Sequence, residues 1–163
     1  MTLHKTPPRV LGVISDTHGL LRPDVHTALA GVELILHAGD VGGDEILMEL
    51  ALIAPVRAVY GNTDEPGQPA LSPAIDIVIG GVSIHVSHGH EVGSPTPQKL
   101  LECYVADVVV YGHTHRPLIT RAADRLVLNP GAAGPRRFDI APSVARLTIA
   151  DGRAEAELIA LRA

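Results

Sequence analysis

The stretch RVLGVISDTHG, residues 9–19, is the part of the chain from which the fold can be worked out. Its apolar first part, residues 9–15, predicts a buried strand, which runs directly into the polar sequence DTHG. Pro23 suits the first turn of a helix, and residues 24–30 continue that helix. A buried strand followed by a polar turn and a helix is typical of an α/β protein.

The same alternation continues outward to residue 60. Residues 33–37 and 56–60 predict two further strands, and residues 44–53 predict the helix between them. This β-α-β-α-β order favours parallel strands joined by right-handed crossovers. Residues 66–73 contain three prolines, so we expect a loop there.

Beyond this loop the pattern changes to strands separated mainly by turns. Gly80-Gly81 suits a tight hairpin between strands at residues 75–79 and 82–87. The remaining expected elements are strands at 107–111, 118–121, 125–128, 144–149 and 154–159, and a helix at 98–104. The expected class is therefore α/β, and 163 residues are enough for a single domain, residues 1–163.

Composition excludes several classes of protein. Apolar residues make up 46% of the chain, but it has only three Tyr, one Phe and no Trp, so the core must be aliphatic. Cys103 is the single cysteine, which excludes an internal disulfide framework and a multi-cysteine zinc module. We read Cys103 as a small core residue and expect a cytoplasmic location, with which a lone thiol is compatible.

The charge and hydropathy of the chain indicate which kinds of partner it does not bind. Residues 1–8 are short and polar, and no run approaches the 18 or so apolar residues of a membrane span, so no membrane partner is expected. The net charge is −5 and no Lys/Arg stripe is present, which argues against binding to a nucleic-acid backbone. The oligomeric state stays open, a homo-oligomer included.

Nine histidines outnumber the aromatic residues, and several stand where expected strands end. Those strand ends carry a set of potential metal ligands: Asp16, His18, Asp40, Asn62, His88, His113 and His115. Singly, an Asp or Asn after a strand is a turn former or helix cap, and a His is a structural residue. Together at the C-terminal ends of strands, where α/β sheets place their sites, they predict a metal centre.

The donor types indicate which metal. Imidazole, carboxylate and amide donors without thiolates favour two divalent ions, Mn²⁺ above all, with Zn²⁺, Fe²⁺ or Ni²⁺ as alternatives. Seven donors exceed one tetrahedral ion, and two ions bridged by Asp40 fit better. Such a centre would carry a net charge of about +1 and attract a phosphate despite the acidic chain.

The ordered motifs D-x-H, G-D, G-N, H and G-H-x-H, with N-P-G at residues 129–131, resemble those of the calcineurin-like metallophosphoesterase superfamily. The chain is most similar to its small YfcE-type phosphodiesterases and more distantly to the Vps29 scaffold. The resemblance implies a four-layer αββα sandwich with a central dinuclear site. It also implies which residues act as ligands: Asp16, His18 and His115 for one ion, Asn62, His88 and His113 for the other, and Asp40 as the bridge.

By the same resemblance, the activity is that of a hydrolase acting on a small phosphodiester. A metal-bridging water or hydroxide would attack phosphorus in line, without a covalent enzyme intermediate. Two alternatives stay open: a phosphomonoesterase or nucleotide phosphatase, and a Vps29-like protein-binding scaffold with little activity. The natural substrate is not revealed by the sequence.

One position departs from the family pattern. Thr63 follows Asn62 where the better-studied protein phosphatases have a His that assists the leaving group, and Thr is not an acid near neutral pH. Asn62, Asp64 and His90 are therefore the candidate catalytic residues. Asp64 alternatively caps its loop, and His90 either contacts substrate or orients a ligand.

The remaining polar residues receive structural interpretations. His37 and His85, inside apolar strands, are expected to be buried supporting residues, while His4 and His26 are expected at the surface. The pair Arg136-Arg137 is interpreted as either exposed to solvent or holding its loop in place (loop-pinning). The alternative is that the pair binds a phosphate of the substrate.

Overall fold

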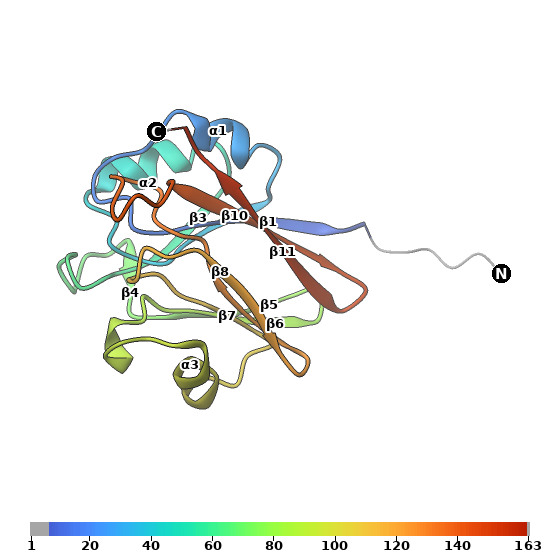
Figure 1. Ribbon diagram of the computed structural model, residues 1–163. Helices are drawn as coiled ribbons and strands as arrows, with labels where there is room; N and C mark the ends of the chain where they lie inside the picture. The colour runs from blue at the N-terminus through green and yellow to red at the C-terminus, as the bar shows by residue number, and fades with distance from the viewer. Residues whose placement is uncertain (1–6, 163) are drawn as a thin grey trace.

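The computed structural model describes residues 7–162, which form two stacked β-sheets with helices on the outside (Figure 1). The first sheet has the order β11-β10-β1-β2-β3-β4. Its strands are β1 (Arg9–Ile14), β2 (Leu34–His37), β3 (Val56–Val59), β4 (Leu71–Ser72), β10 (Ser143–Ala150) and β11 (Arg153–Ala160).

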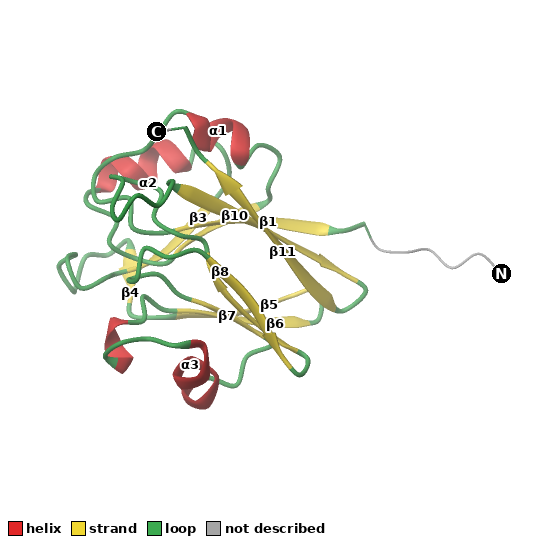
Figure 2. Cartoon of the chain, in the orientation of Figure 1, coloured by secondary structure: helices red, strands yellow, loops and turns green. Residues whose placement is uncertain are grey.

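The second sheet has the order β5-β6-β7-β9-β8. Its strands are β5 (Ile75–Ile79), β6 (Val82–Val86), β7 (Val108–Val110), β8 (Leu118–Ala122) and β9 (Arg125–Asn129). The helices are α1 (Asp24–Ala28), α2 (Asp44–Leu50), α3 (Pro97–Cys103) and the 3-10 turn η1 (His90–Val92). Figure 2 shows α1 and α2 over the first sheet and α3 on the far side of the second.

The apolar core follows these layers. Within residues 7–162, one buried cluster lies between the sheets, a second joins the first sheet to α1 and α2, and a third joins the second sheet to α3. The largest fully buried side chains are aliphatic, as the composition predicts, with Leu11, Leu36 and Leu128 among them. The expected α/β class with αββα layering is confirmed.

Parallel pairing determines where the loops meet. Strands β1, β2 and β3 run parallel to one another, as the β-α-β-α-β prediction requires, and β6, β7 and β9 are parallel within the second sheet. The C-terminal ends of each parallel set therefore share one edge of their sheet, and the loops after β1, β2, β3, β6 and β7 converge there.

Several details differ from the expectations. The proline-rich segment 66–73 contains the short strand β4, which pairs with β3. Helix α2 ends at Leu50 rather than residue 53, because the chain tightens into turns before Pro55, and a residue preceding proline disfavours the helical conformation. Helix α1 likewise ends at Ala28 rather than residue 30.

The interpretation of Cys103 as a core residue is wrong, because its thiol is free and exposed. Helix α3 packs through Leu100 and Leu101, and Cys103 lies about a sixth of a turn outside that face. In the part of the chain that the structure describes, no helix is both long and apolar enough to cross a membrane.

Candidate metal centre

The expected ligands all lie at the edge where the parallel strands end. Asp16 and His18 follow β1, Asp40 follows β2, and backbone hydrogen bonds join these two loops. The Asp16 N–H donates to the Gly39 carbonyl at 2.9 Å, and the His18 N–H donates to the Asp40 carbonyl at 3.0 Å. The β1 and β2 loops are thus fixed to each other before any side chain is considered.

The backbone at the ligands is unusual. Five of them adopt positive φ, between 45° and 71°: Asp16, His18, Asp40, His113 and His115. Left-handed backbone is uncommon outside glycine, although Asp and His tolerate it better than most residues. Strained conformations of this kind cluster at functional sites, where the surrounding structure holds them.

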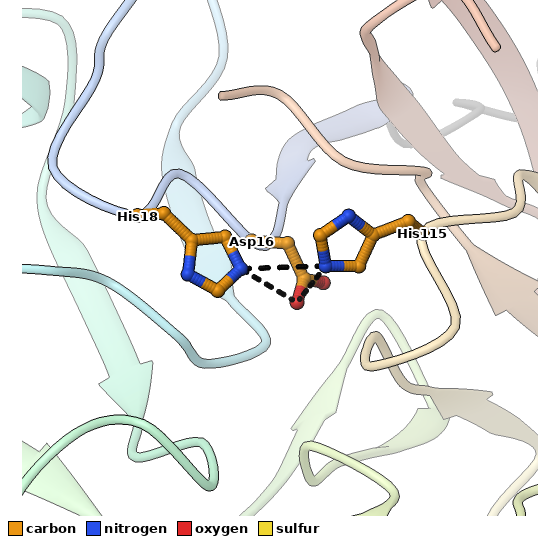
Figure 3. Close-up of side chains that lie close together, drawn as sticks. All are labelled: Asp16, His18 and His115. Carbon is orange, nitrogen blue, oxygen red and sulfur yellow. Dashed lines mark hydrogen bonds and ion pairs between the residues drawn. The ribbon is translucent and has the colours of Figure 1, made fainter. Parts of the chain in front are cut away.

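The first ligand group comprises Asp16, His18 and His115 (Figure 3). Asp16 Oδ1 lies 3.3 Å from His115 Nε2 and 3.7 Å from His18 Nε2, and the two imidazole nitrogens are 3.3 Å apart. This Oδ1 is buried and makes no hydrogen bond to any residue of the described range 7–162. The other oxygen, Oδ2, accepts from the Ser15 hydroxyl at 2.6 Å and from the His113 N–H at 3.1 Å. One carboxylate oxygen is therefore anchored, and the other is free to bind a cation.

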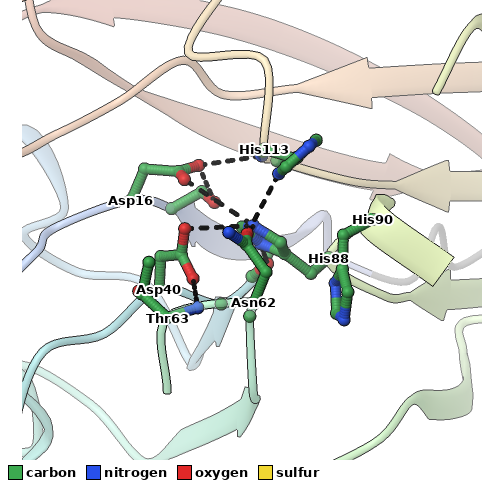
Figure 4. Close-up of polar contacts among 12 residues, drawn as sticks. Asp16, Asp40, Asn62, Thr63, His88, His90 and His113 are labelled. Atoms are coloured by element: carbon green, nitrogen blue, oxygen red, sulfur yellow. Dashed lines mark hydrogen bonds and ion pairs between the residues drawn. The ribbon is translucent and has the colours of Figure 1, made fainter. Parts of the chain in front are cut away.

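The second ligand group comprises Asn62, His88 and His113 (Figure 4). Asn62 Oδ1 lies 3.0 Å from both His88 Nε2 and His113 Nδ1. His88 Nδ1 is 2.7 Å from the Ala38 carbonyl, which can only accept, so Nδ1 carries a proton. In the neutral ring the Nε2 lone pair then points at the Asn62 oxygen, an arrangement that a cation between the two atoms satisfies.

Asp40 lies between the two groups. Its Oδ2 is 3.2 Å from His88 Nε2 and 3.7 Å from His18 Nε2, while its Oδ1 accepts the Thr63 N–H at 2.9 Å. The free oxygen therefore faces nitrogens of both groups. The donor types and their convergence fit divalent metal ions.

Two glycines make this close packing possible. A Cβ on Gly61 would lie 2.1 Å from Asp40 Oδ1, and a Cβ on Gly112 would lie 2.6 Å from Asp16 Oδ2. No side chain fits at either position without moving the carboxylate. Glycine is required beside both carboxylates because the backbone approaches them so closely.

The ionisation states of Asp16, Asp40 and His113 suit metal binding. Burial raises the pKa of Asp16, but the proximity of His115 and His18 lowers it further, so the pKa ends well below its ordinary value. Burial also raises the pKa of Asp40, and the opposing influence of His88 and Thr63 brings it to about 2. Burial lowers the pKa of His113. At neutral pH, the carboxylates are ionised and His113 is neutral, which are the states that bind metal.

His90 lies beside the second group on η1. Its ring centroid is 5.3 Å from that of His88 and 6.3 Å from that of His113. Its Nδ1 is buried and has no hydrogen-bond partner in the described part of the chain, residues 7–162. The structure thus places His90 at the edge of the candidate metal centre.

Asp64 has the contacts of a loop cap. Its carboxylate accepts the backbone N–H groups of Val41, Gly42 and Gly61 at 3.0 to 3.1 Å. These hydrogen bonds tie the loop after β2 to the loop after β3. Its oxygens are therefore engaged with backbone rather than facing the ligand groups.

Supporting residues include one that the sequence interpretation did not single out. Asn129 is buried and donates from Nδ2 to the Gly112 carbonyl and Thr114 Oγ1, both at 3.1 Å, so it braces the loop that carries His113 and His115. The N-P-G motif marked this position without indicating its role.

The buried histidines expected to be supporting residues are confirmed as buried. His37 Nε2 lies 3.0 Å from Thr17 Oγ1, inside the loop that carries Asp16 and His18. His85 Nδ1 lies 2.8 Å from Asp76 Oδ1. His26 is half-exposed beside Glu49, and His4 lies outside the described residues.

Carboxylates, an amide and imidazoles at the C-terminal edge of an αββα sandwich define the class of metal-dependent phosphoesterases. The chain belongs to the calcineurin-like phosphoesterase superfamily, whose domain model matches residues 10–152. A probable metallophosphoesterase of Methanothermobacter thermautotrophicus is 37% identical over 159 residues, which cover 92% of this chain and 91% of that protein. A phosphodiesterase of Methanocaldococcus jannaschii is 30% identical over 143 residues, covering 74% of this chain and 82% of that protein.

Solved structures of related proteins have the same fold. An archaeal phosphodiesterase superposes with a TM-score of 0.73 at 26% identity, covering 93% of this chain and 99% of its own. Vps29 of Cryptosporidium parvum has a TM-score of 0.80 at 21% identity, covering 96% and 99%, which shows the shared fold. The family and these relatives identify the chain as a metal-dependent phosphoric ester hydrolase.

Proposed function

We propose that residues 1–163 form one metallophosphoesterase domain that hydrolyses a small phosphodiester at a dinuclear centre. The observation that carries the proposal is the pair of ligand groups with the free Asp40 oxygen between them, 3.2 Å from His88 Nε2 and 3.7 Å from His18 Nε2. Asp16, His18 and His115 would hold one ion, and Asn62, His88 and His113 the other, with Asp40 shared. Mn²⁺ is the proposed metal, which suits the oxygen donors, with Zn²⁺, Fe²⁺ or Ni²⁺, which suit imidazole, as alternatives.

The metal ions, when bound, would supply Lewis acidity toward the phosphate oxygens and lower the pKa of water. The protein holds the ligand atoms in place before substrate arrives. The Thr63 N–H anchors Asp40, the Ser15 hydroxyl anchors Asp16, and the Ala38 carbonyl orients His88. Preorganisation of this kind lowers the reorganisation needed in the transition state.

The remaining candidate catalytic residues receive distinct roles. We propose that His90 contacts the substrate, since its ring borders the second group. Asp64 is proposed to position the loops after β2 and β3, which its three backbone hydrogen bonds support. Thr63 supplies no acid at neutral pH, so efficient hydrolysis is expected for esters with good leaving groups.

The test uses untagged protein stripped with a chelator and then supplied with Mn²⁺. Hydrolysis of bis-p-nitrophenyl phosphate should be absent without metal and restored by it, and Asp40→Asn should reduce turnover by about 1000-fold. Asp124→Asn, at an exposed turn, is the control and should keep wild-type activity. Elemental analysis should find two ions per chain. Failure of metal to restore turnover, or an Asp40→Asn variant as active as wild type, would refute the proposal.

A second candidate function is protein binding, which the similarity to Vps29 favours. Vps29 of Entamoeba histolytica, solved in complex with zinc, superposes with a TM-score of 0.73 at 26% identity, covering 93% of this chain and 98% of its own. A pure scaffold has no need of convergent ionised carboxylates and aligned imidazoles, so we favour the enzyme. A cytoplasmic location is part of the proposal, and the free thiol of Cys103 is compatible with it.

A further inference from the structure

The only phenylalanine of the chain stands at the surface. Phe138 is 70% exposed and has a φ of 57°, in the left-handed region. A bulky aromatic residue with positive φ is a true outlier, and burial would stabilise its ring. Neither backbone preference nor core packing therefore accounts for a phenylalanine here.

Phe138 and Asp139 form the tip of a short turn. The Ile140 N–H donates to the Arg137 carbonyl at 3.0 Å, and both residues between them have positive φ, 57° and 56°. Two-residue turns with this backbone prefer Asn-Gly or Asp-Gly. The turn is braced by Arg136, whose Nη2 donates to the Asp139 carbonyl at 3.2 Å, which agrees with the loop-pinning interpretation of Arg136. The loop thus exposes an aromatic ring at a position whose backbone conformation disfavours bulky residues.

Arg116 lies over this ring. Its guanidinium carbon is 5.6 Å from the ring centroid, a cation–π geometry. No acceptor for the guanidinium N–H groups is found among residues 7–162, so their edge is free. Arg116 directly follows His115 of the first ligand group, so its backbone belongs to the loop that carries His113 and His115. A guanidinium stacked on an aromatic ring with free N–H groups is well suited to bind phosphate.

The loop that carries Phe138 is fixed to the metal centre at its base. The Ala133 N–H donates to the Ser15 carbonyl at 2.9 Å, and the Gly134 N–H donates to the Asp16 carbonyl at 3.2 Å. Arg22 reinforces this base through two hydrogen bonds to the Gly134 carbonyl, at 3.1 and 3.0 Å. The ring is therefore four residues from a segment that is bonded to a metal-ligand residue.

We propose that Arg116 and Phe138 form a substrate subsite for the nucleoside part of a small nucleotidyl phosphodiester. This inference rests on the proposed function. The base would stack on the ring of Phe138, and Arg116 would bind a phosphate oxygen beside the metal centre. Stacking on an aromatic side chain suits any nucleobase, since every base has a π-face. The absence of a basic stripe favours a small nucleotidyl ester over a polymer.

The test compares two substrates with the same leaving group. Thymidine 5′-(p-nitrophenyl phosphate) and methyl p-nitrophenyl phosphate both release p-nitrophenolate and differ in the nucleoside. Phe138→Ala in the Mn²⁺-loaded protein should lower kcat/KM for the thymidine ester by about 5- to 100-fold and leave the methyl ester within twofold. Phe138→Tyr should retain the preference. Val105→Ala, at a residue 95% exposed and outside the subsite, is the matched apolar control.

Arg116→Ala should lower kcat/KM for both esters, because both carry the phosphate that Arg116 would bind, and Arg153→Ala, at the exposed first residue of β11, is its control. Calorimetric binding of thymidine 5′-monophosphate should fall by the same factor in Phe138→Ala, a readout independent of turnover. Equal losses on both esters in Phe138→Ala, or no change in either activity or binding in that variant, would overturn the subsite. Absence of Mn²⁺-dependent hydrolysis of both esters in the wild type would overturn the proposed function instead.

Discussion

The two ends of the sandwich use the same rare backbone conformation for different purposes. At the turn end, which carries the β8–β9 and β10–β11 hairpins, Ala123 and Asp151 have φ of 55° and are exposed. At the ligand end, which carries the loops after β1, β2, β3, β6 and β7, Asp16 and Asp40 have φ of 53° and 55° but are buried. The left-handed backbone reverses the chain at the turn end, whereas at the ligand end it aims polar side chains at one point. A change of backbone conformation should therefore alter catalytic activity only at the ligand end.

The largest effect is expected from a matched pair of glycine substitutions. In Gly61→Ala, the new Cβ would lie 2.1 Å from Asp40 Oδ1, so the carboxylate must move. Misplacement by about 1 Å lowers activity about 100-fold, and overpacking costs about 1–3 kcal/mol of stability. At the turn end, Gly81→Ala meets nothing within 4 Å, but its φ of 81° costs about 1–2 kcal/mol.

Urea denaturation and Mn²⁺-dependent hydrolysis of bis-p-nitrophenyl phosphate measure both quantities. Gly81→Ala should lose stability while its activity stays within twofold of wild type. If Gly61→Ala kept full activity, the close approach of the backbone to Asp40 would have no part in the site.

Relief of strain should separate stability from function. Glycine carries no penalty at positive φ, so His18→Gly, at a φ of 45°, should keep or raise the stability of the metal-free protein by up to about 1 kcal/mol. The same change removes a proposed ligand, so activity should fall at least tenfold. Asp151→Gly should gain similar stability with unchanged activity. Thermal denaturation in chelator and steady-state rates are the measurements, and a marked loss of stability in His18→Gly would contradict this view of the ligand end.

The buried histidine behind the ligand end should make stability depend on pH. Complete burial lowers the pKa of His37 from 6.5 to about 4, so the folded protein keeps the ring neutral. Below pH 6.5, the unfolded chain binds a proton that the folded chain does not, so the stability contribution is complete above that pH. It should decline by up to about 3 kcal/mol as the pH falls toward 4. Urea denaturation at pH 7, 5.5 and 4.5 should show a shallower decline in His37→Gln, and equal declines would refute this assignment.

The smallest effect is expected in the layer beneath the ligand end. The Tyr104 hydroxyl donates to Glu91 Oε2 at 2.9 Å, and Glu91 Oε1 accepts the Gly89 N–H at 2.8 Å, between His88 and His90. Tyr104→Phe removes the first of these hydrogen bonds and should cost about 1 kcal/mol of stability. Activity should fall two- to fivefold, mainly through KM if His90 contacts substrate. Tyr60→Phe is the control, and an unchanged KM in Tyr104→Phe would show that η1 is positioned by other contacts.

Much of the fold could be predicted because it depends on local patterns of apolar and turn residues. The apolar runs and their turns predicted the strands, and strand order predicted that Asp16, Asp40 and Asn62 meet at one edge. Cys103 was misplaced because a seven-residue helix has too few apolar positions to define its buried face from sequence. Strand β4 was missed because two residues, Leu71–Ser72, carry no periodicity, and their pairing with β3 is a long-range contact.

By itself the sequence determined the α/β class, the aliphatic core and the chemical types of the ligands, because these depend on composition and on short-range periodicity. The tertiary structure alone decided how those residues work together. It decided that one oxygen of Asp40 is held by Thr63 while the other faces both ligand groups, and that Asp64 binds backbone. It also decided that Phe138 lies under Arg116. Such pairings join residues far apart in the chain, so they follow from the packing of two sheets rather than from any local run of residues.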